Sequence, residues 1–135
     1  MNMQELSRYY KLKERLIQNQ EILRSLQAKA SVGISVLTGL PHTSGTSDKV
    51  SYLGIEIAYM KEQIEVLKGE ITTEKQKLEA YIDGIDDDRV KIICRLRYVH
   101  CMTWIQVADT MGWAYNDTSV RKLVSNYLKK HNQDV

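Results

Sequence analysis

The residues best suited to a chemical task lie near the C-terminus, where polar and cationic side chains follow a helical spacing. Between Asp117 and Asp134 the chain has no acidic residue, but it has hydroxyls, amides, lysines and an arginine. Such groups donate hydrogen bonds to DNA phosphates and to base edges. The apolar residues recur at the helical spacing that predicts one buried face: Val120, Leu123, Val124, Tyr127 and Leu128.

We predict that the outward face of this helix is a DNA-binding surface. In a helix-turn-helix, the N-terminal part of the last helix reaches the bases. Base-edge contacts are therefore expected from Asn116, Thr118, Ser119 and Lys122. Contacts to phosphates or to the flanks of the bases are expected from Arg121, Ser125, Asn126 and Lys129. The alternative is a small three-helix domain whose basic face is solvated and binds nothing.

Two shorter helical segments, DDRVKIICRLRYVH and TWIQVADTMG, must hold this last helix in place. In the second segment Thr103 and Gln106 match a capping box, in which each side chain accepts a hydrogen bond from a free backbone N–H. Gly112 predicts the end of that helix in a left-handed conformation. Asn116 or Asp117 can cap the last helix. Three helices with a tight turn between the last two form the outline of a helix-turn-helix.

The periodicity also predicts which residues of the two shorter segments are buried. In the first segment the buried stripe contains Val90, Ile93, Cys94, Arg97 and Cys101, flanked by Ile92, Leu96 and Val99. In the second it contains Trp104, Ile105, Ala108 and Met111. A small residue such as Ala108 allows the last helix to pack closely.

Residues 1–85 are predicted to form a helical arm, so the whole chain is expected to be all-α. Heptad repeats are expected over residues 3–30 and 49–83, with a loop at residues 31–49 between them. The first seam, which a single polar residue interrupts, contains Tyr9, Leu12, Leu16, Asn19, Leu23, Leu26 and Ala30. The second, with one polar exception, contains Val50, Leu53, Ile57, Met60, Ile64, Leu67, Ile71, Glu74, Leu78, Tyr81 and Ile85. A helix with such a narrow apolar seam must pack against another long helix, which predicts an antiparallel hairpin. Because the second seam is longer, its surplus predicts a homo-oligomer, a dimer, through the arm. Residues 86–135 then form the helix-turn-helix domain.

The loop is predicted from its helix-breaking residues, which include Gly33, Gly39 and Pro41. Its side chains also offer a candidate catalytic triad: His42, Ser44 and Asp48. We reject the triad because no structured cleft is implied, and polar residues are expected by chance in a segment rich in Ser and Thr.

We expect neither an enzyme nor a cofactor. The chain has no phosphate-binding loop, nucleophile elbow or metal-ligand cluster. Cys94 and Cys101 would lie roughly 10 Å apart on one helix, too far for a disulfide. With His100 they match no common zinc spacing, so buried small hydrophobes are the expected role of both cysteines. The aspartates at 86–88 are expected to cap a helix.

The charge is divided unevenly along the chain. Residues 1–88 carry 11 Lys and Arg against 14 Asp and Glu, whereas residues 89–135 carry 8 against 3. The basic excess therefore falls on the segment expected to meet DNA. No apolar run is long enough to span a membrane and the N-terminus lacks the apolar core of a secretory signal, so we expect a cytoplasmic protein.

The runs RLRYVHCMTWIQVADTMG and SVRKLVSNYLKK resemble region 4 of bacterial sigma factors. The overall plan is similar to small regulators of Gram-positive phages and prophages, the ArpU/RinA-like group. The resemblance implies a phage or prophage regulator of transcription, with Trp104, Ile105, Ala108 and Gly112 as framework. It also implies that Ser119, Arg121 and Lys122 lie on the recognition helix. The turn WAYNDTS is about two residues longer than the sigma pattern, which affects the expected docking more than the fold.

Three functions are open at this point. The first is a sequence-specific protein that binds double-stranded DNA and acts in transcription. The second is a protein like the small subunit of a phage terminase, which joins a helix-turn-helix to helical oligomerisation segments and serves DNA packaging. The third is a helical adaptor whose arm binds a protein such as RNA polymerase. A dimer or monomer favours a regulator, whereas a ring of eight or more copies favours packaging.

Overall fold

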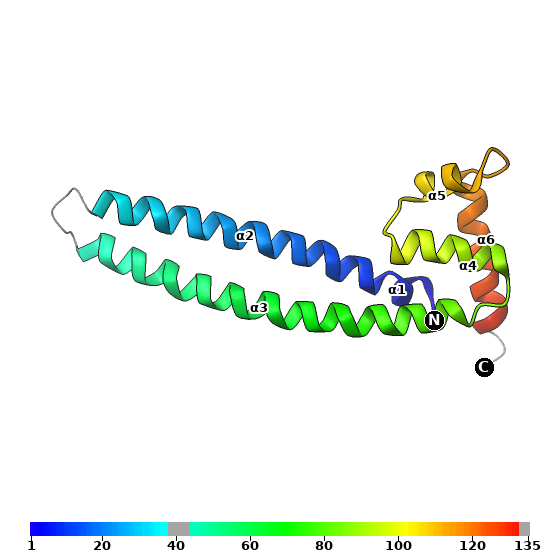
Figure 1. The fold of residues 1–135 in the computed structure, drawn as a ribbon, viewed down its shortest axis with the longest axis horizontal. Helices are drawn as coiled ribbons and strands as arrows, with labels where there is room; N and C mark the ends of the chain where they lie inside the picture. The colour runs from blue at the N-terminus through cyan, green and yellow to red at the C-terminus, as the bar shows by residue number, and fades with distance from the viewer. Residues whose placement is uncertain (38–43, 133–135) are drawn as a thin grey trace. The chain divides into compact units, whose positions relative to one another are not determined.

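The computed structural model describes the backbone of residues 1–37 and 44–132 and the side chains of residues 1–31 and 52–132. Over these ranges the fold is all-α, as predicted (Figure 1). The elements are α1 (Met3–Leu6), α2 (Arg8–Leu37), α3 (Ser44–Asp83), α4 (Asp88–Cys94), the π-helical turn η1 (Arg95–Val99), α5 (Trp104–Met111) and α6 (Asp117–Asn132).

The chain divides into two compact units. The terminal unit consists of residues 1–12 and 71–135, and the central unit consists of residues 13–70. The predicted domain boundary between residues 85 and 86 falls inside the terminal unit. The reason is that the end of α3 and the first residues of the chain belong to the same apolar core as α4 to α6.

The N-terminal helix is interrupted near its start. The Asn2 side chain caps α1 by accepting a hydrogen bond from the Glu5 N–H at 2.8 Å. The Ser7 hydroxyl donates to the Met3 carbonyl at 2.7 Å. Such back-bonding by serine bends helices, and it coincides here with the break between α1 and α2.

The predicted loop at residues 31–49 is for the most part wrong. α2 continues to Leu37 and α3 already begins at Ser44, so Gly33 and Gly45 lie within helices. A glycine costs a helix only about 1 kcal/mol relative to alanine, which a long helix tolerates. Residues 38–43, and with them His42, lie outside the described residues, as do the side chains of Ser44 and Asp48.

The residues predicted for the two seams are less exposed than their neighbours in the central unit. On α2 the half-buried positions from residue 14 onward are Leu16, Asn19, Leu23, Leu26 and Ala30. On α3 the predicted seam residues Leu53, Ile64 and Leu67 are buried, and Ile57 and Met60 are half-buried. The two segments run side by side in opposite directions (Figure 1).

The C-terminal part of α3 packs within the terminal unit. Leu78, Ile82 and Ile85 are buried in the core of this unit, where they share a cluster with Leu6 and Tyr9. This part of the seam is therefore already covered by the chain itself. Glu74, the one polar residue of that seam, lies 3.9 Å from Arg8 and 4.0 Å from Lys77.

The helix that begins with α4 changes to a π-helical turn, η1, before it ends. In η1 the His100 N–H bonds to the Arg95 carbonyl at 3.0 Å, five residues back. This wider turn shifts the buried face by one residue, so Tyr98 and Val99 are buried. The prediction that Cys101 is buried is wrong: it is exposed, beyond the helix, with φ of 60°.

Candidate nucleic-acid interface

α4, α5 and α6 gather in one cluster in the terminal unit (Figure 1), where α5 and α4 both contact α6. Asp87 caps α4, because one carboxylate oxygen accepts from the Arg89 N–H at 3.0 Å and the Val90 N–H at 3.3 Å. Of the three aspartates predicted to cap this helix, only Asp87 does so, while Asp88 lies in the first turn.

The predicted capping box at the start of α5 is confirmed. The Thr103 hydroxyl accepts a hydrogen bond from the Gln106 N–H at 3.2 Å, and the Gln106 side chain accepts one from the Thr103 N–H at 2.9 Å. Both bonds satisfy donors that the first turn of a helix leaves free. The start of α5 is thereby fixed by local sequence.

The turn between α5 and α6 is held at both ends. Gly112 ends α5 with φ of 119°, a conformation that favours glycine. The Tyr115 N–H then bonds to the Gly112 carbonyl at 3.1 Å. At the other end the Asn116 side chain accepts from the Ser119 N–H at 2.8 Å, and the Ser119 hydroxyl accepts from the Asn116 N–H at 2.9 Å. Of the two predicted caps, Asn116 is therefore the one used.

α6 has two different faces. Val120, Val124 and Leu128 are buried, at 0 to 5% exposed, and Leu123 and Tyr127 are half-buried beside them. The predicted DNA-binding residues share the other side. Those that are exposed are Asn116, Thr118, Arg121, Lys122, Asn126 and Lys129, and those that are half-buried are Ser119 and Ser125. The structure thus brings all eight together on one surface.

The eight residues are not equivalent. The side chains of Asn116 and Ser119 bond to each other's backbone, so the cap already uses the Asn116 Oδ1 and the Ser119 hydroxyl. Thr118, Arg121 and Lys122 are exposed on the first turns of α6. These three are better placed than the capping pair to contact a ligand.

Sequence reasoning missed two exposed apolar residues in α5 and in the turn that follows it. Trp113, in the turn, is 99% exposed. Ile105, which was predicted to face the core, is 67% exposed, and Val107 is buried in its place. The available signal for Trp113 was its position in a turn, where no helical spacing assigns it to a core. The half-buried Trp104 and Met111 pack against the core as partly buried residues.

Arg97 joins the first residues of the chain to the start of α5. Its guanidinium lies 5.0 Å from the ring centre of Tyr10 and 5.0 Å from that of Trp104. One terminal nitrogen donates to the Met102 carbonyl at 2.8 Å. The cation is held mainly by aromatic faces and a carbonyl, and its Nε atom is buried without a hydrogen-bond partner.

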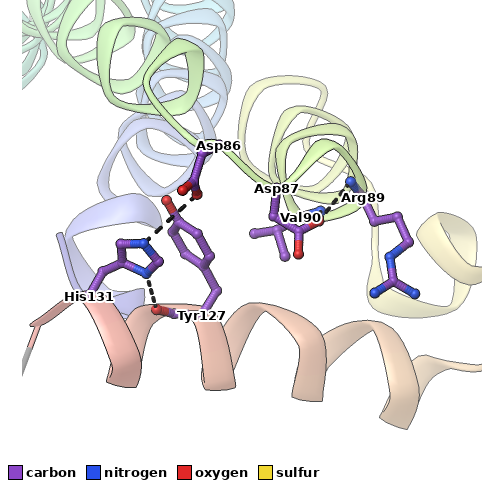
Figure 2. Close-up of polar contacts among 6 residues, drawn as sticks. All are labelled: Asp86, Asp87, Arg89, Val90, Tyr127 and His131. Atoms are coloured by element: carbon purple, nitrogen blue, oxygen red, sulfur yellow. Dashed lines mark hydrogen bonds and ion pairs between the residues drawn. The ribbon is translucent and has the colours of Figure 1, made fainter.

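A second polar cluster lies where α6 passes the start of α4 (Figure 2). The ring of His131 stacks on that of Tyr127, with centres 3.9 Å apart, and its Nε2 lies 3.8 Å from an Asp86 oxygen. Its Nδ1 lies 3.0 Å from the Tyr127 carbonyl, which can only accept, so Nδ1 carries a proton. Desolvation and the Asp86 charge raise the pKa of the Tyr127 hydroxyl. These residues border an open hollow of about 480 Å³ that also includes Lys130.

Cys94 contributes to packing and not to chemistry. It is 1% exposed, and burial raises the pKa of its thiol to about 12. The thiolate, which is the reactive form, is therefore scarce at neutral pH.

The geometry defines an all-α protein whose terminal unit presents a cationic helix after a capped turn. The chain belongs to the family described as "Protein of unknown function (DUF1492)", whose model matches residues 42–127. The match includes α4, α5, the turn and the first eleven residues of α6. No curated protein and no solved structure is significantly similar to the chain. No helix among the described residues is long and apolar enough to cross a membrane.

Proposed function

We propose that the protein binds double-stranded DNA in a sequence-specific manner and regulates transcription, with α5, the turn and α6 acting as a helix-turn-helix of the sigma region 4 type. In this proposal α6 is the recognition helix and enters the major groove. The proposed setting is the cytoplasm of a bacterium carrying a phage or prophage, as the resemblance to the ArpU/RinA-like regulators implies.

The observation that carries the proposal is the division of α6 into two faces. Its apolar side is buried against α4 and α5, while its outward side combines hydroxyl, amide and cationic groups. After Asp117 the described part of α6 contains no carboxylate that would repel phosphate. A helix that reads DNA needs this arrangement, because the cations neutralise phosphates and the polar groups contact base edges.

The geometry refines the roles proposed for the eight residues. Thr118 and Lys122 lie on the first turns of α6, where base contacts are expected, with Arg121 beside them. Asn126 and Lys129 lie one to three turns later and are proposed to contact phosphates. Asn116 and Ser119 are proposed to position the helix through their cap, and Ser125 lines the edge of the surface.

The experiment is selection of preferred duplexes from a random pool, followed by fluorescence anisotropy with the selected duplex and a scrambled one. The proposal expects the selected duplex to bind at least about 1,000-fold more tightly than the scrambled one. The double variant Arg121→Ala, Lys122→Ala should lose binding while its circular dichroism is unchanged. Failure of any sequence to be enriched would contradict sequence-specific binding.

The second candidate is a helical adaptor that binds a protein such as RNA polymerase through its terminal unit, and not through the arm as first expected; Trp113 and Ile105, both in the terminal unit, favour it. Tryptophan is enriched in the energetically dominant parts of protein interfaces, and both side chains are largely exposed here. The double variant Trp113→Ala, Ile105→Ala distinguishes the two. If it abolishes capture of purified RNA polymerase and leaves DNA affinity unchanged, the adaptor role is supported. A DNA-packaging protein like a terminase small subunit would instead form a ring of eight or more copies in light scattering.

A further inference from the structure

The central unit has a shallow groove on one side of the contact between α2 and α3. Its volume is about 260 Å³. The residues around it come from both helices: Arg15, Asn19, Tyr59, Met60, Gln63, Val66, Leu67 and Glu70. Asn19 interrupts the α2 seam at this groove, so the seam is open to one side there.

Two large side chains of α3, Tyr59 and Val66, line the groove and are 54% and 52% exposed. Tyr52, one heptad before Tyr59, is 61% exposed. The three are spaced by seven residues, which keeps them on one face of the helix. Ile22 on α2 is 47% exposed. All four side chains are outside the seam, and large exposed apolar residues at such spacing are typical of an interaction site.

The charges on this side of the central unit follow the same seven-residue spacing. Arg15, Ile22 and Lys29 recur on α2, and Glu56, Gln63 and Glu70 recur on α3. Arg15 and Glu70 border the same groove. Because the helices run in opposite directions, Ile22 is then level with Gln63, and Lys29 with Glu56. One helix is basic along this face and the other is acidic.

We propose that this face binds a second copy of the same chain, with α2 of each copy lying over α3 of the other. A two-fold axis parallel to the helices produces this pairing and forms a closed dimer. Arg15 and Lys29 of one copy then face Glu70 and Glu56 of the other, and the apolar side chains between them pack together. A two-fold axis perpendicular to the helices would instead place α3 of one copy on α3 of the other, with carboxylates against carboxylates. The proposed dimer is independent of whether the terminal unit binds DNA.

The test uses two charge-reversed versions of the full chain. One carries Arg15→Glu and Lys29→Glu, and the other carries Glu56→Lys and Glu70→Lys. In sedimentation at micromolar concentration, wild-type protein should be a dimer and each variant alone a monomer. In a dimer of one variant, α2 and the facing α3 would carry charges of the same sign at both contacts between the copies. An equimolar mixture should recover the dimer, since every contact between the two chains then joins opposite charges.

Charge reversal also changes the interaction between α2 and α3 within one chain, so a second variant tests the dimer without changing any charge. Tyr59→Ser with Val66→Ser should also yield a monomer with unchanged helix content by circular dichroism. The matched control is Arg24→Glu, an exposed residue on another side of α2, which should leave the dimer intact. A wild-type monomer at 100-fold higher concentration, a ring of many copies, or dimeric charge variants would overturn the proposal.

Discussion

The exposed sides of α3 and α6 differ in composition, and for that reason we propose a different partner for each. α3 in the central unit presents tyrosines and valine between glutamates, a surface suited to another helix. α6 in the terminal unit presents hydroxyls, amides and cations, a surface suited to a polyanion. Both helices bury a regular apolar stripe, so the stripe shows how each helix packs, and the two binding proposals rest on the opposite faces.

The largest predicted effect is a loss of stability when a buried residue of the terminal unit is truncated, compared with an exposed neighbour. Ile93 is 0% exposed, whereas its neighbour Ile92 is 50% exposed. Ile93→Ala should lower the free energy of unfolding by about 2–5 kcal/mol, because it removes packed methyl groups and leaves a cavity. Ile92→Ala should change it by within about 0.5 kcal/mol. Urea denaturation measures both, and equal losses would mean that the buried face is misassigned.

A smaller loss is predicted for Arg97→Met. The substitution removes a cation between two aromatic rings and the hydrogen bond to the Met102 carbonyl. We expect a loss of about 1–3 kcal/mol, since each of these contacts contributes on the order of 1 kcal/mol. Arg95→Met is the control, because the contact of the Arg95 side chain within the described part of the chain is a long surface ion pair with Asp83 at 3.9 Å. Thermal denaturation with no difference between the two variants would contradict the role of Arg97.

The cap of α6 is predicted to contribute still less to the free energy of unfolding. Asn116→Ala should destabilise by about 1 kcal/mol, because the Ser119 N–H loses its acceptor. Thr118→Ala, next to it on the exposed face, should leave the thermal midpoint unchanged. If Thr118→Ala destabilises as much as Asn116→Ala, the proposed separation between capping and contact residues is wrong.

The sequence predicted the elements that have strong local signals. Thr103 with Gln106, the Asn116 cap and the Gly112 stop depend on neighbours within a few residues, and all three are in place. The seam of α3 was likewise predicted, because a heptad repeat over ten apolar positions tolerates few alternatives.

The misassigned residues depend on effects that a helical wheel does not contain. The π-helical turn η1 shifts the register after Cys94, so Tyr98 and Val99 are buried and Cys101 is not. Ile105 and Val107 exchange roles because the packing of α5 on α6 sets which side faces inward. Arg97 could not be anticipated either, since its partner Tyr10 is 87 residues away in the chain.

The salt dependence of DNA affinity tests the central claim most directly. For wild-type protein, a plot of log Kd against the logarithm of the salt concentration should be a straight line that rises with salt. The reason is that Lys and Arg side chains bound to phosphates release counterions from DNA. Lys129→Ala, which removes a proposed phosphate contact, should reduce that slope by about 1 and leave the thermal midpoint unchanged, while Lys61→Ala in the central unit should change neither. Absence of binding at low salt, or an affinity that does not respond to salt, would contradict a DNA-binding function.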